Sequence, residues 1–290
     1  MVVGARRAVP LQCDRITSMK WLNVAPDEAL GKILVHNIAD AEGHKALHKG
    51  TRIGESDVES LRALGMNEVS VAALEDGDVH EDDAARRLAL ACMRGGVTAS
   101  DASGGRVNLL SAFGGLVKVE AESLRQVNLI DGLTVATLRH DTLAAANKIV
   151  ATIKVIPFAV PEADIARAEV ICGAHSGIVG VRALRSLQVG VILAGSEASK
   201  ARVMKAFAPA IRARVEELGS NVRDVVYVPH QSRAIANAIE LLRLANTELI
   251  MIAGETSIMD REDVTPRGIV EAGGVIEHYG APVEPGNLLL

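Results

Sequence analysis

The last third of the chain alternates apolar, strand-like runs with amphipathic segments. Of all the features of the sequence, this alternation most restricts the folds that the chain can adopt. The apolar runs cover residues 188–193, 222–228, 248–253 and 275–279, and segments with helical spacing lie between or before them at residues 197–218, 232–245 and 265–272. In the first of these segments the spacing of four predicts a buried face that contains Val203, Phe207, Ile211 and Val215. Strands that alternate with helices predict right-handed crossovers and a mostly parallel sheet.

Composition agrees with helix-covered sheets. The chain is 49% hydrophobic but only 2% aromatic, so its cores must be built from Ala, Val, Leu and Ile. Its 290 residues are enough for two domains. We predict an α/β protein with a three-layer αβα C-terminal domain at residues 186–290 and a smaller mixed α+β region at residues 19–185, with a candidate split near residue 74. Residues 1–18, ahead of a second possible start at Met19, are predicted to be a disordered extension.

Local signals place elements in the N-terminal region. Pro26 followed by acidic residues predicts a short helix over residues 26–34. Residues 80–93 have helical spacing, with Asp82 and Asp83 in the first turn. Residues 149–156 are rich in β-branched side chains and predict a strand. Residues 180–182 and Arg185 are interpreted as linker.

Charge and cysteine content exclude several classes of protein. The net charge is −5, from 31 basic and 36 acidic side chains, which argues against a nucleic-acid partner. No apolar run approaches the roughly 18 residues of a membrane span. Cys13, Cys92 and Cys172 are far apart and show no metal-ligand spacing. We therefore expect a cytoplasmic protein that binds neither nucleic acid nor membrane.

Ligands of open parallel sheets bind beyond the carboxyl ends of the strands. Here the predicted ends are followed by short polar segments at residues 194–197, 229–232, 254–263 and 282–287. Free backbone N–H groups at residues 254–257, with the hydroxyls of Thr256 and Ser257, would hold phosphate oxygens. The layout predicts a phosphorylated ligand.

Acidic side chains follow directly, at Asp260, Glu262 and Asp263. They would repel phosphate unless a cation or proton intervened, which suggests a metal or an acid–base role for one of them. The alternative is that they cap the helix expected near Thr265. We favour capping for Asp263 and leave Asp260 open. His230, at another strand end, is interpreted as a turn residue, with a site role as the alternative.

These segments resemble the cofactor loops of molybdopterin-binding proteins of molybdenum-cofactor biosynthesis. Gly254, Ser257 and Asp260 match a Gly-Gly-x-Ser-x-Gly-Asp-x-Asp-type loop, and Pro285-Gly286 matches a later Pro-Gly loop. The chain is also similar to a subgroup that is fused in some members to a nucleotidyltransferase, at residues 106–109, 152–160, 260–264 and 285–289.

The resemblance implies molybdopterin or its adenylylated form as ligand, with Mg²⁺ and molybdate as further candidates. It implies Asp260 as catalytic residue and metal ligand. Glu255 is not part of the family pattern, and we predict it beside Asp260 as a second catalytic residue. The resemblance also implies a homodimer and a molybdenum-cofactor nucleotidyltransferase as partner. The cofactor-binding residues that we predict, from the matched loops and from the strand ends together, are Gly195, Ser196, Glu197, Gly254, Thr256, Ser257, Asp263, Pro285, Gly286 and Asn287.

The chain departs from the family pattern at several points. Glu255 and Met259 stand where the loop has glycine, and residues 195–197 and 229–230 lack two acids that molybdotransferases carry. Two functions therefore stay open: a molybdotransferase-like enzyme that acts in molybdate insertion, or a non-catalytic carrier that delivers cofactor to a nucleotidyltransferase or apoenzyme. Related proteins continue past the apolar residues 288–290, so we expect either a truncated chain or a final strand there.

Overall fold

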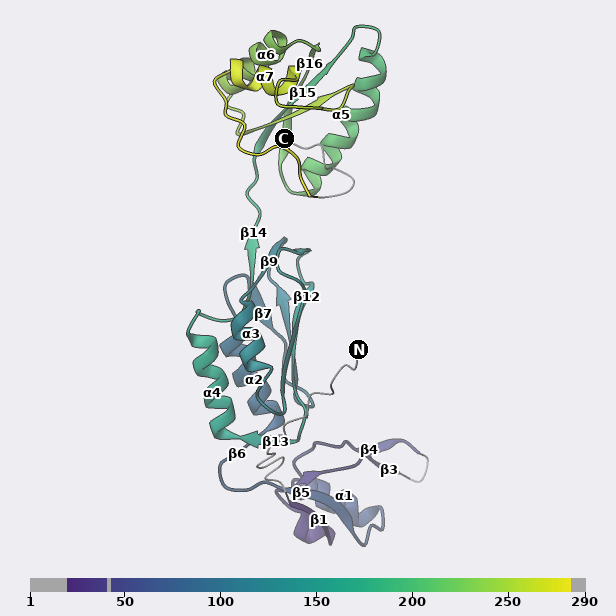
Figure 1. Ribbon diagram of the computed structural model, residues 1–290. Coiled ribbons are helices and arrows are strands. Elements are labelled where there is room, and N and C mark those ends of the chain that lie inside the picture. Colours follow the sequence, from purple (N-terminus) through teal and green to yellow (C-terminus); the bar gives the residue numbers. More distant parts are fainter. Residues whose placement is uncertain (1–19, 41–42, 283–290) are drawn as a thin grey trace, which may run out of the picture. The chain divides into compact units, whose positions relative to one another are not determined.

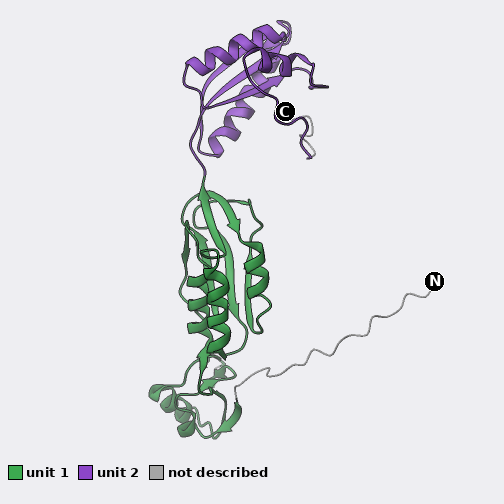
Figure 2. Ribbon diagram, turned by 60° about the vertical axis from the view of Figure 1, so that its left-hand side comes forward, with its two compact units in different colours: residues 1–183 green, residues 184–290 purple. Residues whose placement is uncertain are grey.

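A computed structural model describes residues 20–40 and 43–282 (Figure 1). The chain divides into two compact units, Met1–Ala183 and Leu184–Leu290 (Figure 2). The predicted mixed α/β class is confirmed, with antiparallel strands in the first unit and a helix-flanked parallel sheet in the second. Over these same residues, no helix combines the length and hydrophobicity that a membrane span requires.

The first unit begins with a small antiparallel sheet in the order β1-β5-β2, packed on one helix. The predicted helix over residues 26–34 is wrong beyond its first turn, because Ile33 and Leu34 are buried as a strand that pairs with Ala72 and Val71. The elements are β1 (Lys20–Val24), the 3-10 turn η1 (Pro26–Ala29), β2 (Ile33–Leu34), β3 (Ile38–Ala39), β4 (Lys45–Leu47), α1 (Glu55–Ala63) and β5 (Val69–Ala73).

The remainder of the first unit packs helices on the antiparallel sheet β10-β12-β8-β7, with Leu88, Leu109 and Ile153 fully buried between them. Residues 179–183, part of which we interpreted as linker, are a strand whose apolar side chains are buried against β9. The elements are β6 (Asp78–His80), α2 (Glu81–Cys92), β7 (Val97–Ala99), β8 (Arg106–Ser111), β9 (Gly115–Val119), α3 (Ala121–Val127), β10 (Leu133–Thr137), β11 (Leu143–Ala144), β12 (Ile149–Val155), β13 (Ala159–Pro161), α4 (Glu162–Gly173) and β14 (Val179–Ala183).

The second unit is a parallel sheet in the order β16-β15-β17. Side chains alternate along the central strand, so Val191 and Leu193 pack against α5, whereas Ile192 packs against α6. Figure 1 shows α5 on one side of the sheet and α6 with α7 on the other. The elements are β15 (Gln188–Gly195), α5 (Lys200–Glu217), β16 (Asn221–Pro229), α6 (Ser232–Leu244), β17 (Leu249–Gly254) and α7 (Val264–Glu271).

Two details of the second unit differ from the prediction. Residues 275–279 form no strand. The Val275 side chain is 82% exposed, so burial of this side chain does not stabilise a strand at these residues. Phe207 lies at the edge of the buried face of α5 and is 37% exposed. A spacing of four drifts by about 40° per step on a helix of 3.6 residues per turn, and Met204 and Ala208 fill part of the contact instead.

Candidate functional site

The carboxyl ends of the three strands meet at one edge of the sheet. Gly195 at the end of β15 is in register with Pro229 of β16, and Ala194 is in register with Gly254 of β17. The segments that follow the strands therefore lie side by side, as the topology predicts. Of the fourth predicted segment, Pro285, Gly286 and Asn287 lie outside the described residues.

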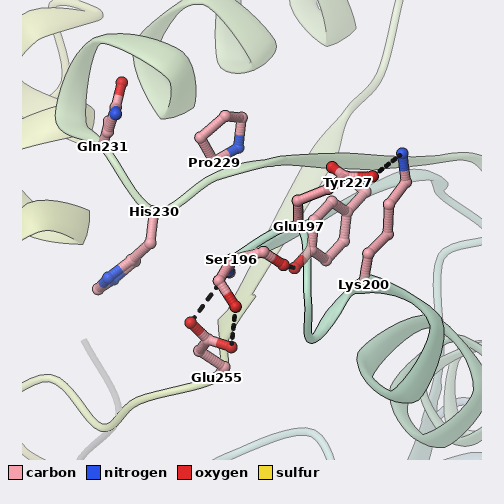
Figure 3. A pocket seen from close by; sticks show the side chains of 9 residues that line it. Ser196, Glu197, Lys200, Tyr227, Pro229, His230, Gln231 and Glu255 are labelled. Carbon is pink, nitrogen blue, oxygen red and sulfur yellow. Dashed lines mark hydrogen bonds and ion pairs between the residues drawn. The ribbon is translucent and has the colours of Figure 1, made fainter.

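A cavity of about 600 Å³ opens at this edge (Figure 3), and we call it the strand-end cavity. Its volume is within the range of small-molecule sites. It brings together four of the predicted site residues, three residues of the predicted rim segment 229–232, and Lys200 and Tyr227, which sequence reasoning missed. The lining residues are Gly195, Ser196, Glu197, Lys200, Tyr227, Pro229, His230, Gln231 and Glu255.

Hydrogen bonds fix the wall of the cavity between β15 and α5. The Tyr227 hydroxyl donates to the carbonyl of Ser196 at 2.6 Å, and the Ser199 hydroxyl donates to the same carbonyl at 3.0 Å. The two hydroxyls are 3.1 Å apart. Gly195 leaves room for this network, because a Cβ there would lie 2.5 Å from the tyrosine oxygen. The backbone that follows β15 is therefore held in place before any ligand binds.

Glu255 closes one side of the cavity. Its carboxylate accepts from the Ser196 amide at 3.0 Å and lies 3.5 Å from the Ser196 hydroxyl (Figure 3). The Ser199 hydroxyl and the Ser196 amide hold the pKa of Glu255 below its usual 4.5, so this side chain is ionised at neutral pH. The backbone amide of Glu255 donates to Ala194, so the prediction of a free amide at this position is wrong.

Lys200 is the cation of the cavity, and sequence reasoning missed it. It is the first residue of α5, and its ammonium group lies 3.7 Å from Glu197 and 5.7 Å from the centre of the Tyr227 ring. Both contacts are loose, and Glu197 is 87% exposed, so this ammonium remains available to an anion. A basic residue one turn after the end of a predicted central strand is the signal that could have found it.

In the acidic loop after β17, the carboxylates of Asp260 and Asp263 accept hydrogen bonds from backbone amides. Asp263 is the N-cap of α7 and accepts from the amides of Val264 at 2.6 Å and Met259 at 3.1 Å. The Met259 and Val264 amides lower the pKa of Asp263, and its interpretation as a helix cap is confirmed. Asp260 accepts from the Glu262 amide at 2.6 Å. Asp260 and Asp263 do not line the strand-end cavity.

Gly254, Thr256 and Ser257 are also absent from the cavity lining, and the side chains of the latter two are exposed. A metal centre would need several carboxylates or imidazoles around one point. Residues 20–40 and 43–282 contain no group of three or more His, Cys, Asp or Glu side chains so arranged. The carboxylates of Glu255, Asp260 and Asp263 all accept from backbone amides instead. Because the described residues do not gather three such ligands around one point, metal binding by Asp260 stays a prediction.

Comparison with known proteins assigns the segment that holds this cavity. Residues 190–283 match the family described as a probable molybdopterin binding domain, and residues 23–73 match a domain of unknown function (DUF8806). The first family belongs to molybdenum-cofactor biosynthesis. Every residue that lines the strand-end cavity lies inside its matched segment. The second unit therefore contains a probable molybdopterin-binding domain.

Among solved structures, the chain is similar to the molybdopterin biosynthesis moea protein from Pyrococcus horikosii, at 11% identity and a TM-score of 0.24. The match covers 93% of this chain, but the chain spans only 66% of that protein's length. A likeness at this TM-score carries no argument about fold or site. A comparison with curated proteins found no match.

Proposed function

We propose that the chain binds molybdopterin, or its adenylylated form, in the strand-end cavity and acts in molybdenum-cofactor biosynthesis. The observation that carries this proposal is the position of the cavity. It lies at the carboxyl ends of three parallel strands and inside the segment that matches the molybdopterin-binding family.

The lining residues suit a phosphorylated pterin. Lys200 would take the phosphate, because its ammonium group has only loose contacts among the described residues, with an exposed carboxylate 3.7 Å away and with the Tyr227 ring. Glu255 would accept from the N–H groups of the pterin ring. Tyr227 would offer an aromatic edge and a hydroxyl that is already positioned by Ser196.

Replacing Lys200 with glutamine is expected to weaken binding of molybdopterin about tenfold, since a charge-assisted hydrogen bond contributes more than a neutral one. Affinity is measured by calorimetric titration of the full chain with the purified compound under anaerobic conditions. Lys205→Gln is the matched control, because Lys205 is exposed on the same helix but lies outside the cavity. Equal losses in the two variants, or no heat from the wild type, would show that the cavity does not hold the pterin.

Molybdate insertion is a second candidate function, favoured by the exposed carboxylate of Glu197 in the cavity wall. We expect that an enzyme of this kind releases AMP when incubated with adenylylated molybdopterin, molybdate and Mg²⁺. Asp260→Asn should then abolish the release and keep pterin binding, as the family resemblance implies. Tight pterin binding without AMP release would instead support a carrier that delivers the cofactor to a nucleotidyltransferase or apoenzyme.

A homodimer stays a prediction, which light scattering would check.

A further inference from the structure

We propose that a second cavity, in the first unit, binds a small phosphate-bearing molecule. This cavity has a volume of about 410 Å³, and we call it the arginine cavity. It lies between the turn that follows α2, strands β9 and β14, and the loop after β10. The side chains on which the argument rests are Arg94, Lys118, Glu120, His140 and Arg182, with Gly180 in the floor.

The cationic side chains share one face of the β9–β14 pair. Val117 and Val179 are fully buried on the other face. Because side chains alternate along a strand, Lys118 and Gly180 point away from the core, and these two residues are direct partners in the register. Arg182 is two residues further along β14 and shares their face.

Gly180 brings Arg94 onto this face. A Cβ at position 180 would lie 2.8 Å from the Cβ of Arg94 and 2.8 Å from the carbonyl oxygen of Gly95. The turn is fixed on β14 by hydrogen bonds from the Arg94 amide to Val179 at 2.8 Å and from the Val181 amide to Gly95 at 3.0 Å. Any side chain at position 180 would fill this crossing, so the glycine keeps the floor of the cavity open.

The two arginines have no carboxylate partners among the described residues. Lys118 is paired with Asp141, but within residues 20–40 and 43–282 no ion pair or side-chain hydrogen bond involves the guanidinium groups of Arg94 and Arg182. Arg87 of the same unit, by contrast, is paired with both Glu162 and Glu169. Two unneutralised guanidinium groups in one hollow favour an anion.

Phosphate is the chemistry that fits these groups. A guanidinium presents parallel N–H donors that match two phosphate oxygens. The lining carries three cationic side chains and one carboxylate, Glu120. Because Asp141 already pairs with Lys118, the two guanidinium groups are the charges that remain for one small phosphate-bearing molecule. Three cations in a chain of net charge −5 are too few for a polynucleotide, which requires a dense basic surface.

Inorganic pyrophosphate is the probe that tests this proposal, in a calorimetric titration of the full chain at low ionic strength. We expect Arg94→Gln and Arg182→Gln each to weaken its binding at least about tenfold. Glu120→Gln should strengthen binding, because it removes the one carboxylate of the lining. Arg125→Gln is the matched control and should leave the affinity unchanged, since Arg125 is exposed, paired with Glu122 and outside the cavity.

Pyrophosphate could also enter the strand-end cavity, and the Lys200→Gln variant separates the two sites. Heat that survives the Arg94→Gln/Arg182→Gln double variant but is lost in Lys200→Gln would overturn the proposal. The absence of heat from the wild type would overturn it too, as would equal losses in Arg125→Gln and the cavity variants. None of these outcomes bears on pterin binding, which is measured with the pterin itself.

Discussion

Lys154→Met is expected to destabilise the first unit by about 3 kcal/mol at neutral pH, because it leaves a buried carboxylate without its cation. Glu81 is only 4% exposed, and its nearest cation is the Lys154 ammonium at 3.4 Å. The carboxylate is enclosed by two turns, since a Cβ at Gly50 or Gly105 would lie 2.7 Å or 2.6 Å from its oxygens. Both glycines have positive φ, at 84° and 68°, so each is suited to the tight turn it occupies. Lys154 is 32% exposed on its side chain, which places the expected loss at the lower end of the range for buried pairs.

The destabilisation should depend on pH in a defined direction. Burial raises the pKa of Glu81 above its usual 4.5, and Lys154 opposes that rise. A raised pKa in the folded state means that the folded chain binds more protons than the unfolded chain. The contribution of Glu81 to stability is therefore fully present below pH 4.5 and is lost as the pH rises through the folded-state pKa. Without Lys154 the fall should be steeper, so the variant should differ least from the wild type in acid.

Urea unfolding followed by circular dichroism, with hydrogen exchange at α2 and β12, measures this loss in the first unit. Lys118→Met is the matched control, because its partner Asp141 is 56% exposed and surface pairs contribute about 0–1 kcal/mol. The double variant Glu81→Gln/Lys154→Met should recover most of the stability. It should keep a deficit of about 1 kcal/mol, because Lys154 also donates to Gly104 at 2.7 Å. Equal losses in Lys154→Met and Lys118→Met at neutral pH would contradict the argument.

The elements of the second unit could be predicted because their signals are local. The central strand and α5 show their periodicities within single windows, and the structure places both near the expected residues. Residues 275–279 have the same kind of apolar pattern but no partner to bury it, and Val275 stays 82% exposed. In the first unit, Ile33 and Leu34 form a strand because of the distant β5, which no local window contains.

In the candidate site, too, some residues could be predicted from the sequence and others could not. Ser196 and Glu255 could be predicted, because the topology of a parallel sheet states where its strand ends meet. Tyr227 could not, since it lies inside β16 and not in the segment that follows the strand. Glu81 stands in a run of three acids that also suits a helix N-terminus. Its burial depends on two glycine turns at a distance in the sequence.

Ile192→Ala is expected to cost the second unit about 3 kcal/mol, within the range of about 2–5 kcal/mol for truncation of a buried isoleucine. Ile192 is fully buried and packs with Ala238 and Leu242 of α6. The helix cannot move inward to fill the space, because it already approaches β15 at its closest point. A Cβ at Gly190 would lie 2.8 Å from a methyl group of Leu242. The truncation should therefore leave a lasting cavity, which is the costly case.

Ile192→Val is the graded control, with an expected loss of about 1 kcal/mol for one methylene group. Urea unfolding gives both values, and hydrogen exchange should show the loss in the amides of α6. Because Ile192 faces α6 and does not line the strand-end cavity, the affinity of folded Ile192→Ala for molybdopterin should equal that of the wild type. This separates a packing defect from the loss expected of Lys200→Gln. If Ile192→Ala cost no more than Ile192→Val, α6 would have to repack over β15, which the approach at Gly190 does not allow.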